Sequence, residues 1–302
     1  MKPPAFAYRA PESLEEALTL LAELGDDAKV LAGGQSLIPL LSLRLARPAF
    51  LVDLARIPGL ASIHELDGWL VVGAMVREGH AERSSLIHRL APLLSAALPF
   101  IGHPAIRSRG TVGGSLAHAD PAAELPAVAL AMDAQLVAAS AARGQRTLPA
   151  GNFFRGFFET ALEPDEILTE IRLSPVPPGT GVCFQEVARR HGDFAMVGVA
   201  TTVRLEDGEI AEARLALTGV SPQPIRAREA EMAMVGAVPS DNTFEAAAET
   251  ATTRLSPPSD LHGSSEYRRH VARVLVRRAL QEAARSAGFP PAEVSAGRWA
   301  AR

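Results

Sequence analysis

The sequence has a single cysteine, Cys183, among its 302 residues. One thiol cannot form a disulfide within the chain, complete a thiolate zinc site or hold an iron–sulfur cluster. Aromatic residues are also scarce, with 11 Phe, 2 Trp and 2 Tyr, and the formal net charge is −4 at pH 7. A nucleic-acid-binding surface, which needs basic side chains and stacking rings, is therefore not expected.

Long hydrophobic runs are missing as well. The most apolar segments are interrupted by Arg44, Glu124 and Asp133, so none reaches the ~18 apolar residues typical of a membrane span. The first twelve residues include Lys2, Arg9 and three prolines, and they lack the apolar stretch of a secretory signal. Together with the lone cysteine, this pattern predicts a reduced compartment, and we expect the protein in the cytoplasm.

The length predicts two domains, at ~150 residues per domain. The proline-rich segment 175–179 is the clearest linker, and it divides the chain into residues 1–177 and 178–288, followed by a tail over residues 289–302. A second break near Pro58 and Gly59 divides the first part into lobes of about residues 1–58 and 59–177.

Hydrophobic spacing predicts helices and strands in both parts. Ser13, followed three residues later by Glu16, is typical of a helix start, and residues 14–24 continue at helical spacing. Asp67-Gly68 predicts a hairpin turn before a strand over residues 69–73. Further helices are expected over 37–43, 78–90, 92–98 and 121–132, and strands over 28–31, 50–54, 134–139 and 166–173. In the second part, strands over 196–205 and 210–217 precede helices over 226–234, 244–254 and 266–287, which indicates an α+β fold.

Two glycine pairs, Gly33-Gly34 and Gly113-Gly114, are the main chemical signal. Each pair precedes a segment compatible with a helix and has a hydroxyl side chain nearby. Glycine permits positive φ angles and lets an anion reach the backbone amides, and consecutive amides can together bind a phosphate. One such loop suits a phosphate, and two suit the pyrophosphate of a dinucleotide held from both sides.

The same glycine pairs are compatible with ordinary turns, since the chain has 24 glycines. Neither loop matches the G-x-G-x-x-G fingerprint or the Gly-Lys-Ser/Thr ending of a P-loop. From the residues alone, a dinucleotide site and a structural turn both stay open. The 8 histidines show no triad or metal-ligand spacing, so we assign no catalytic residue and no metal site to the chain.

Two longer strings are more specific: KVLAGGQSL at residues 29–37 and RSRGTVGGSLAHADP at residues 107–121. With HGDFA at 191–195 and LTGV at 217–220, they resemble the FAD-binding medium subunit of the molybdenum hydroxylase family, which includes aerobic carbon monoxide dehydrogenase and xanthine dehydrogenase-like enzymes. The resemblance extends over nearly the whole chain. It implies a two-lobed FAD-binding domain of the PCMH or vanillyl-alcohol-oxidase-like type, followed by a smaller α+β domain of antiparallel strands and helices.

Residue by residue, the resemblance implies FAD held between the two N-terminal lobes. The first loop would take the pyrophosphate, the second would close from the other side, Glu124 would contact the ribityl or adenosine portion, and Arg189 and Phe194 would line the flavin. Gln35 stands where carbon monoxide dehydrogenases carry His, which weakens the case for that substrate. The implied cofactor-binding set is Lys29, Val30, Leu31, Ala32, Gly33, Gly34, Gln35, Ser36, Leu37, Ile106, Gly110, Thr111, Gly113, Gly114, Ser115, Asp120, Glu124, Arg189 and Phe194.

The resemblance also implies an electron-transfer subunit, in which FAD receives electrons from [2Fe–2S] clusters and passes them to an external acceptor. With one cysteine here, the clusters and the molybdenum–pterin cofactor are expected on a small and a large partner subunit, in a dimer of heterotrimers. The expected interface is residues 103–109, including the charge of Arg107, and residues 191–194. The basic side of helix 266–287 is expected to be solvated, with a partner surface as the second interpretation. The alternatives are a self-sufficient flavin oxidase of the same fold and a non-redox nucleotide-binding module.

Overall fold

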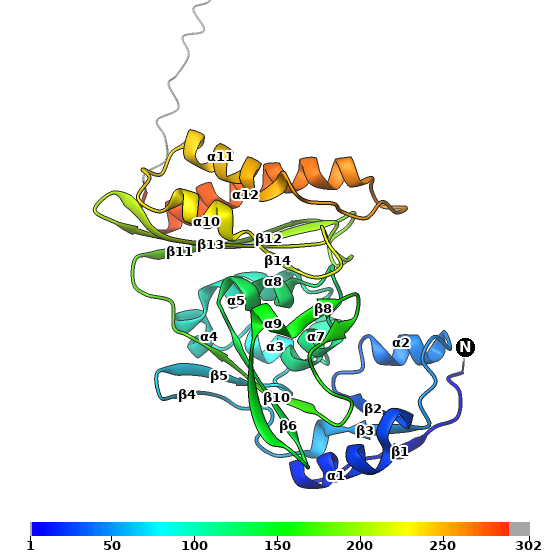
Figure 1. The fold of residues 1–302 in the computed structure, drawn as a ribbon. Coiled ribbons are helices and arrows are strands. Elements are labelled where there is room, and N and C mark those ends of the chain that lie inside the picture. The colour runs from blue at the N-terminus through cyan, green and yellow to red at the C-terminus, as the bar shows by residue number, and fades with distance from the viewer. Residues whose placement is uncertain (1, 290–302) are drawn as a thin grey trace, which may run out of the picture.

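The structure, a computed structural model, describes residues 2–289, and it mixes helices and strands as the α+β prediction requires. Figure 1 shows three parts: an N-terminal lobe with α1 and α2, a central body, and a C-terminal sheet covered by α10, α11 and α12. Of the predicted tail, residues 290–302 lie outside the described part of the chain.

The N-terminal lobe is a three-stranded parallel sheet in the order β1-β3-β2. Its strands are β1 (Ala7–Arg9), β2 (Ala28–Leu31) and β3 (Phe50–Asp53). The predicted helix start is confirmed, because the Ser13 hydroxyl accepts a hydrogen bond from the Glu16 amide at the start of α1 (Leu14–Leu24). The Glu16 carboxylate accepts from the amide of Glu12 and not from that of Ser13. α2 (Leu37–Ser42) follows the first glycine loop directly.

The second lobe is built on a five-stranded antiparallel sheet in the order β4-β5-β10-β6-β7. The predicted turn at Asp67 and Gly68 joins its first two strands, and both residues have positive φ angles, of 50° and 80°. The last strand, β7, is missing from the sequence prediction because its residues are mostly exposed and follow no hydrophobic alternation. The strands are β4 (Ile63–Leu66), β5 (Trp69–Gly73), β6 (Gln135–Ser140), β7 (Gly144–Pro149) and β10 (Ile167–Leu173).

The helices of this lobe differ from the prediction in three places. The single helix expected over 78–90 is two helices, α3 (Glu78–Ala81) and α4 (Ser85–Leu90), because the Ser84 hydroxyl accepts from the amide of Ile87 and starts a new helix. Residues 102–110, for which the sequence predicts no helix, contain the short α6 (Pro104–Arg107). Asp120 does not start a helix: its carboxylate accepts from the amide of Ala122, and α8 begins later. The remaining elements are α5 (Pro92–Ala97), α7 (Val112–His118), α8 (Glu124–Ala131), α9 (Ala150–Phe153), β8 (Phe154–Gly156), β9 (Glu159–Thr160), η1 (Gly25–Asp27), η2 (Leu54–Arg56) and η3 (Leu98–Phe100).

The C-terminal part is a four-stranded antiparallel sheet in the order β11-β12-β13-β14, with helices on one face. The predicted pair β12 and β13 is confirmed. The strand β11 was not predicted, because it contains Gly181, Gln185 and Glu186 and shows no clear alternation. The strands are β11 (Thr180–Val187), β12 (Val197–Glu206), β13 (Glu209–Thr218) and β14 (Ile225–Arg226), and the helices are α10 (Arg228–Met234), α11 (Asp241–Thr252) and α12 (Ser265–Ser286).

The basic side of α12 is solvated only in part, since Arg269 and Arg278 are exposed and other arginines make contacts within the chain. Arg268 is buried, Arg269 donates to the Leu255 carbonyl at 2.9 Å, and Arg273 pairs with Glu245 of α11 at 2.7 Å. These cations connect α12 to its neighbours within the chain.

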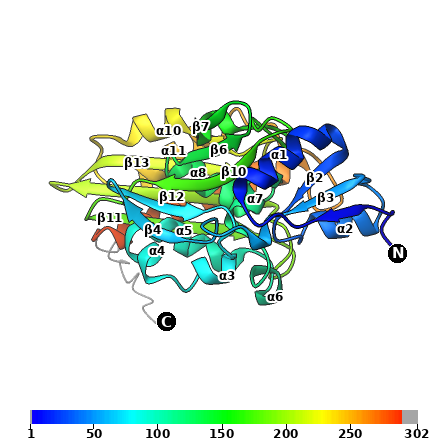
Figure 2. The same ribbon diagram turned by 90° about the horizontal axis from the view of Figure 1, so that it is seen from below.

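The C-terminal sheet packs against the central body through α5 and α8, as Figures 1 and 2 show. The rings of Phe100 and Phe184 meet with centroids 5.2 Å apart. The Thr218 hydroxyl at the end of β13 lies 2.7 Å from the carbonyl oxygen of Pro121 and 2.9 Å from that of Ala123. This contact places the segment between α7 and α8 directly beside the C-terminal part. Within residues 2–289, no helix combines the length and apolar character that crossing a membrane requires.

Candidate functional site

The two glycine loops, far apart in the sequence, lie against each other. A Cβ atom on Gly33 would come within 2.5 Å of the Arg109 carbonyl oxygen and 2.8 Å of the Gly110 Cα. Only glycine allows two backbones to approach this closely. Arg77 supports the contact, since its guanidinium donates to the same Arg109 carbonyl. The two sequence motifs therefore belong to one site.

The first loop carries a row of open backbone donors. Within the described residues, the amides of Gly33, Gly34, Gln35 and Ser36 donate to no protein acceptor. Gly34 has a φ of +75°, a conformation that glycine adopts without strain. Consecutive open amides form a concave anion-binding surface, and unbonded backbone donors are uncommon in folded proteins unless water or a ligand binds them.

The second loop has no matching row of open amides. The expectation that both loops bind the pyrophosphate through backbone amides is therefore corrected. The Gly113 amide donates to Ala74, and the Gly114 amide donates to the Thr111 hydroxyl at 3.1 Å. A Cβ on Gly113 would lie 2.4 Å from the Cβ of Ala74, so this glycine serves packing. The second loop faces the first across Gly114, whose Cβ position is 3.4 Å from the Cβ of Ala32.

Three carboxyl groups have raised pKa values, and one of them, Glu78, lies against the second loop. Burial raises the pKa of Glu78 to about 8, and its Oε2 has no hydrogen-bond partner among the described residues. A Cβ on Gly110 would meet that Oε2 at 2.2 Å, so the carboxyl sits directly under the second loop. Burial also raises the pKa of Glu124 to about 7 and that of Glu186 to about 8. Acids with raised pKa values, two of them buried, are a frequent sign of a functional site.

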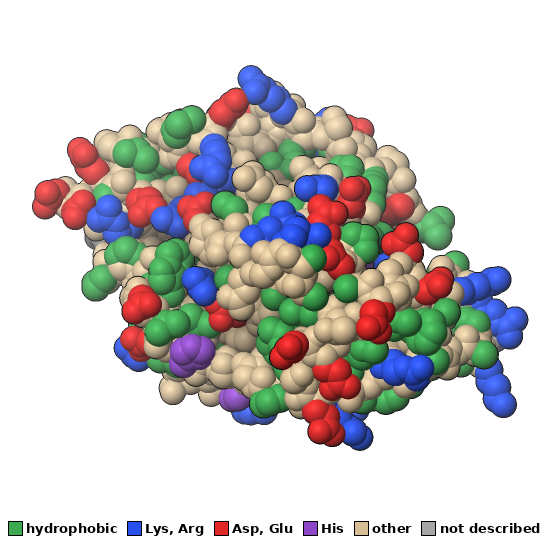
Figure 3. Space-filling view, turned by 60° about the horizontal axis from the view of Figure 1, so that its bottom comes forward, with side chains coloured by type: hydrophobic (Ala, Val, Ile, Leu, Met, Phe, Trp, Pro, Cys, Tyr) green, Lys and Arg blue, Asp and Glu red, His purple; other side chains and the backbone are tan. Residues whose placement is uncertain are grey.

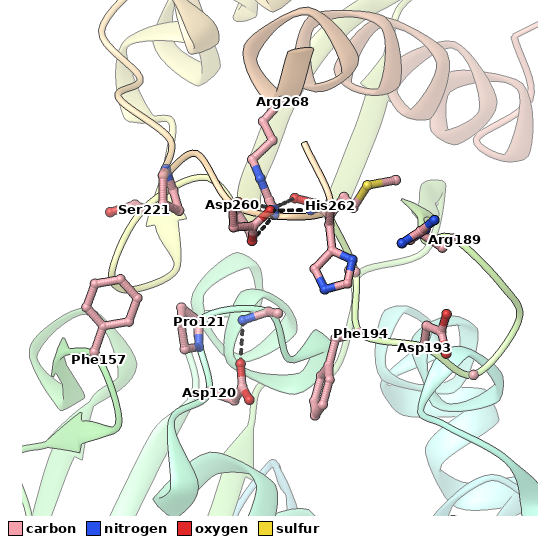
Figure 4. Close-up of a pocket in the computed structure, with 16 residues that line it drawn as sticks. Asp120, Pro121, Phe157, Arg189, Asp193, Phe194, Ser221, Asp260, His262 and Arg268 are labelled. Carbon is pink, nitrogen blue, oxygen red and sulfur yellow. Dashed lines mark hydrogen bonds and ion pairs between the residues drawn. The ribbon is translucent and has the colours of Figure 1, made fainter. Parts of the chain in front are cut away.

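A pocket of about 550 Å³ opens where the segment after α7 meets the C-terminal part. Figure 4 shows Asp120 and Pro121 at its base, with Phe194 and Arg189 on one side and Phe157 and Ser221 on the other. The pocket thus brings together three residues of the implied cofactor set, which are Asp120, Arg189 and Phe194.

The roof of the pocket was not predicted from the sequence. Arg268 of α12 donates to the carbonyl oxygens of Met196 at 2.5 Å and Gly219 at 3.1 Å, and to the Asp260 carboxylate at 2.7 Å. This pairing lowers the pKa of Asp260 to about 2. Arg268 therefore fixes the end of the loop before β12 and the start of the loop after β13. Only its position in the basic cluster of α12 could have drawn attention to it.

The other members of the implied set are more scattered. Lys29 is exposed on β2, whereas the side chain of Leu31 lies near Gly34 and Ile106 is partly exposed beside Gly102. Thr111, Gly113 and Glu124 are buried. Val30, Ala32, Gln35, Ser36, Leu37, Gly114 and Ser115 are all half-buried, and Gly110 is buried.

Arg107 was expected to be a surface charge in the partner interface, and this expectation is wrong. Its side chain is buried, pairs with Glu82 at 2.9 Å and donates to the carbonyl oxygens of Ile101 and Gly102. The guanidinium therefore holds the turn before α6 together. His103, which is exposed, stacks instead on His191 with ring centroids 6.0 Å apart.

Comparison with known proteins identifies the chain. Residues 4–177 match the family described as the FAD binding domain in molybdopterin dehydrogenase, and residues 182–283 match the CO dehydrogenase flavoprotein C-terminal domain. The chain belongs to this flavoprotein family. It is an oxidoreductase subunit with FAD as its cofactor, as the sequence resemblance predicted.

Relatives of this flavoprotein family match along nearly the full length. The chain is 45% identical to the 6-hydroxypseudooxynicotine dehydrogenase complex subunit alpha of Paenarthrobacter nicotinovorans, over 94% of this chain and 96% of the relative. It is 39% identical to the carbon monoxide dehydrogenase medium chain of Hydrogenophaga pseudoflava, over 94% and 98%. Among solved structures, quinoline 2-oxidoreductase from Pseudomonas putida 86 aligns with a TM-score of 0.91 at 40% identity, over 96% of this chain and 100% of the other.

The geometry fits the family's cofactor. FAD has an anionic pyrophosphate, which suits the open amides of residues 33–36, and a planar ring system, which suits a pocket of about 550 Å³ with aromatic side chains. Both features lie on the seam between the parts of the fold, where cofactor sites commonly occur.

Proposed function

We propose that this chain is the electron-transfer subunit of a molybdenum hydroxylase, in which electrons pass from [2Fe–2S] clusters on a partner chain through FAD to an external acceptor. The proposal rests on the row of open amides at residues 33–36. These amides lie beside one end of α7, and the interdomain pocket lies at the other end of the same helix. At 1.5 Å per residue, the seven residues of α7 span ~10 Å. One extended dinucleotide can therefore reach both places.

In this arrangement the residues of the chain hold and orient the cofactor, and FAD, when bound, supplies the redox chemistry. The amides of the first loop bind the pyrophosphate, and the charge of Lys29 on the adjoining strand adds attraction. Glu124 keeps its proton up to about pH 7 and can donate a hydrogen bond to a hydroxyl of the ribityl chain or ribose. Arg189 and Phe194 line the pocket and would contact the flavin ring from the C-terminal part.

The partner subunits follow from what this chain does not supply. Burial raises the pKa of the Cys183 thiol to about 11, so the single cysteine is a poor metal ligand. Relatives carry names such as medium chain and FAD-binding subunit, which supports a small iron–sulfur subunit and a large molybdenum subunit as partners, in a dimer of heterotrimers. The exposed His103 and His191 pair is a candidate part of the interface. We place the domain division near residue 177, between the two family matches.

Co-expression tests the proposal. The chain produced alone should hold FAD yet oxidise no aldehyde, purine, N-heterocycle or carbon monoxide with a dye acceptor. Produced with the subunits encoded beside it, it should co-purify with molybdenum and iron. A chain free of both metals that turns over such a substrate would establish the alternative, a self-sufficient flavin oxidase.

A further inference from the structure

Glu186 of β11 lies at the junction between the C-terminal sheet and the central body. It pairs across the sheet with Gly198 of β12, and Gly198 pairs with Thr218 of β13. Residues directly opposite one another in a sheet point to the same face. The Thr218 hydroxyl donates to the carbonyl oxygens of Pro121 and Ala123, so this face is the one that packs on the central body. Glu186 therefore belongs to the junction between the two parts.

Gly198 leaves a gap in this row of side chains. A Cβ at that position would lie 2.7 Å from the Thr218 Cγ2 and 3.7 Å from the Glu186 Cβ, so a larger residue would displace Thr218. The Glu186 side chain is half-buried, and its Oε2 is enclosed without a hydrogen-bond partner among the described residues. An enclosed carboxyl oxygen without a donor is costly to ionise, because nothing replaces the water that it has lost.

Glu124, the first residue of α8, lies on the other side of this junction. It directly follows Ala123, whose carbonyl oxygen accepts from Thr218, and it is 6% exposed. Burial and the charge of Glu124 raise the pKa of Glu186 to about 8, and burial raises the pKa of Glu124 to about 7. Two carboxylates at one buried junction repel each other, so the second of them ionises only at a higher pH.

Within residues 2–289, no neighbouring cation lowers the pKa of either carboxyl group. The other elements on this face, α5 and η3, contain no ionisable side chain. Arg190 and His191 line a cavity of about 300 Å³ with Glu186, but both are exposed, and His103 stacks on His191. The acids and the histidine on the elements around Glu124 are Glu78, Asp120 and His118, and the arginines there, Arg107, Arg214 and Arg226, pair instead with Glu82 or Asp133.

The junction thus differs from the surface, where Figure 3 shows acidic and basic side chains lying among one another. We propose that Glu124 and Glu186 form a pH-sensitive contact, which holds the C-terminal part on α8 while both carry a proton and loosens when they ionise. The Gly219 amide donates to the Pro121 carbonyl at 2.8 Å beside this contact, and both residues line the larger pocket. Loosening of the junction therefore widens the access to that pocket. The contact involves only residues of this chain, so it does not depend on the proposed function.

Hydrogen exchange of the full chain tests this contact, because the Gly219 amide donates across the junction. When the junction opens, Glu186 ionises near its ordinary pKa of 4.5, so docking is weakened progressively as the pH rises from 4.5 to about 8. Protection of residues 217–220, corrected for the intrinsic exchange rate, should fall about a hundredfold between pH 5 and pH 8 in the wild type. In Glu186→Gln the fall should be about tenfold, because the amide does not ionise and only Glu124 still does.

Two further variants and an internal reference complete the experiment. Glu209→Gln is the matched control, since Glu209 is exposed at the start of β13, and it should behave as the wild type. Glu186→Lys should show the smallest fall, because its ammonium group can pair with ionised Glu124. Residues 50–53 of β3, in the N-terminal lobe, report unfolding of the whole chain, and the difference between the wild type and Glu186→Gln should be absent there.

The outcomes separate this contact from the proposed function. An equal fall in protection in the wild type and Glu186→Gln would overturn the contact, and so would a difference of the same size at residues 50–53. A chain that shows the expected exchange pattern but takes up no FAD would overturn the proposed function alone.

Discussion

Replacing Gly33 by alanine should separate the two loops of the cofactor site. The new Cβ would lie 2.5 Å from the Arg109 carbonyl oxygen and 2.8 Å from the Gly110 Cα, and a normal contact needs about 1 Å more. Both obstacles are backbone atoms, so no side chain can rotate away. One lobe must move relative to the other, and overpacking of this kind costs about 1–3 kcal/mol.

The assay combines thermal unfolding with FAD titration. The free-energy cost corresponds to a melting temperature lower by about 2–5 °C for a chain of this size. The affinity for FAD should fall by at least tenfold, because the displaced loop carries the open amides. Gly151→Ala is the matched control, since a Cβ at that position meets no atom within 4 Å. A Gly33→Ala variant with wild-type melting temperature and affinity would refute the close approach of the loops.

Four further predictions concern single side chains. Gly34→Val should abolish FAD binding, as judged by flavin content, and should also lower the melting temperature, because valine is strained at a φ of +75°. Gly114→Val should lose both flavin and stability, because its Cβ would lie 2.6 Å from the Thr111 hydroxyl that caps α7. Arg107→Glu should lower the unfolding free energy by about 3–5 kcal/mol in denaturant titrations, since it breaks a buried ion pair, whereas Arg109→Glu, at an exposed site, should not. Arg268→Ala should destabilise the pocket loops, which would appear as faster hydrogen exchange over residues 188–196. The wild type should lose stability as the pH falls from about 4 to about 2, because Asp260 is then protonated; Arg268→Ala should not show this loss. The wild type should lose stability as the pH rises from about 4.5 to about 8, because the folded chain keeps the proton on Glu78 while the unfolded chain releases it. Glu78→Gln should not show this loss, and equal pH profiles of stability for the two proteins would contradict the prediction.

Local signals in the sequence predicted much of the fold. The Ser13 cap, the Asp67-Gly68 turn and the β12–β13 pair depend on residues near one another in the chain, and all three are present. The break between α3 and α4 was missed because Ser84 competes as a cap within a continuous apolar pattern. Strand β11 was missed because its pairing with β12, and not its own sequence, makes it a strand.

The candidate site was predictable only in part for a similar reason. The glycine motifs indicate where the backbone is special, but not which glycine faces a ligand and which, like Gly113, packs against Ala74. Arg107 belongs to a motif yet is buried, because its partner Glu82 lies 25 residues earlier in the chain. Phe157 and Arg268 reach the pocket from distant segments, and no local pattern records such a contact.

The most direct test of the central assignment is the flavin content of the purified chain. We expect a yellow protein that binds its flavin non-covalently and, on denaturation, releases about one FAD per chain. FMN is not expected, because it lacks the pyrophosphate and adenylate that the open amides of Gly33 to Ser36 are positioned to bind. A colourless chain that takes up no FAD on incubation, or one that releases FMN, would contradict the account.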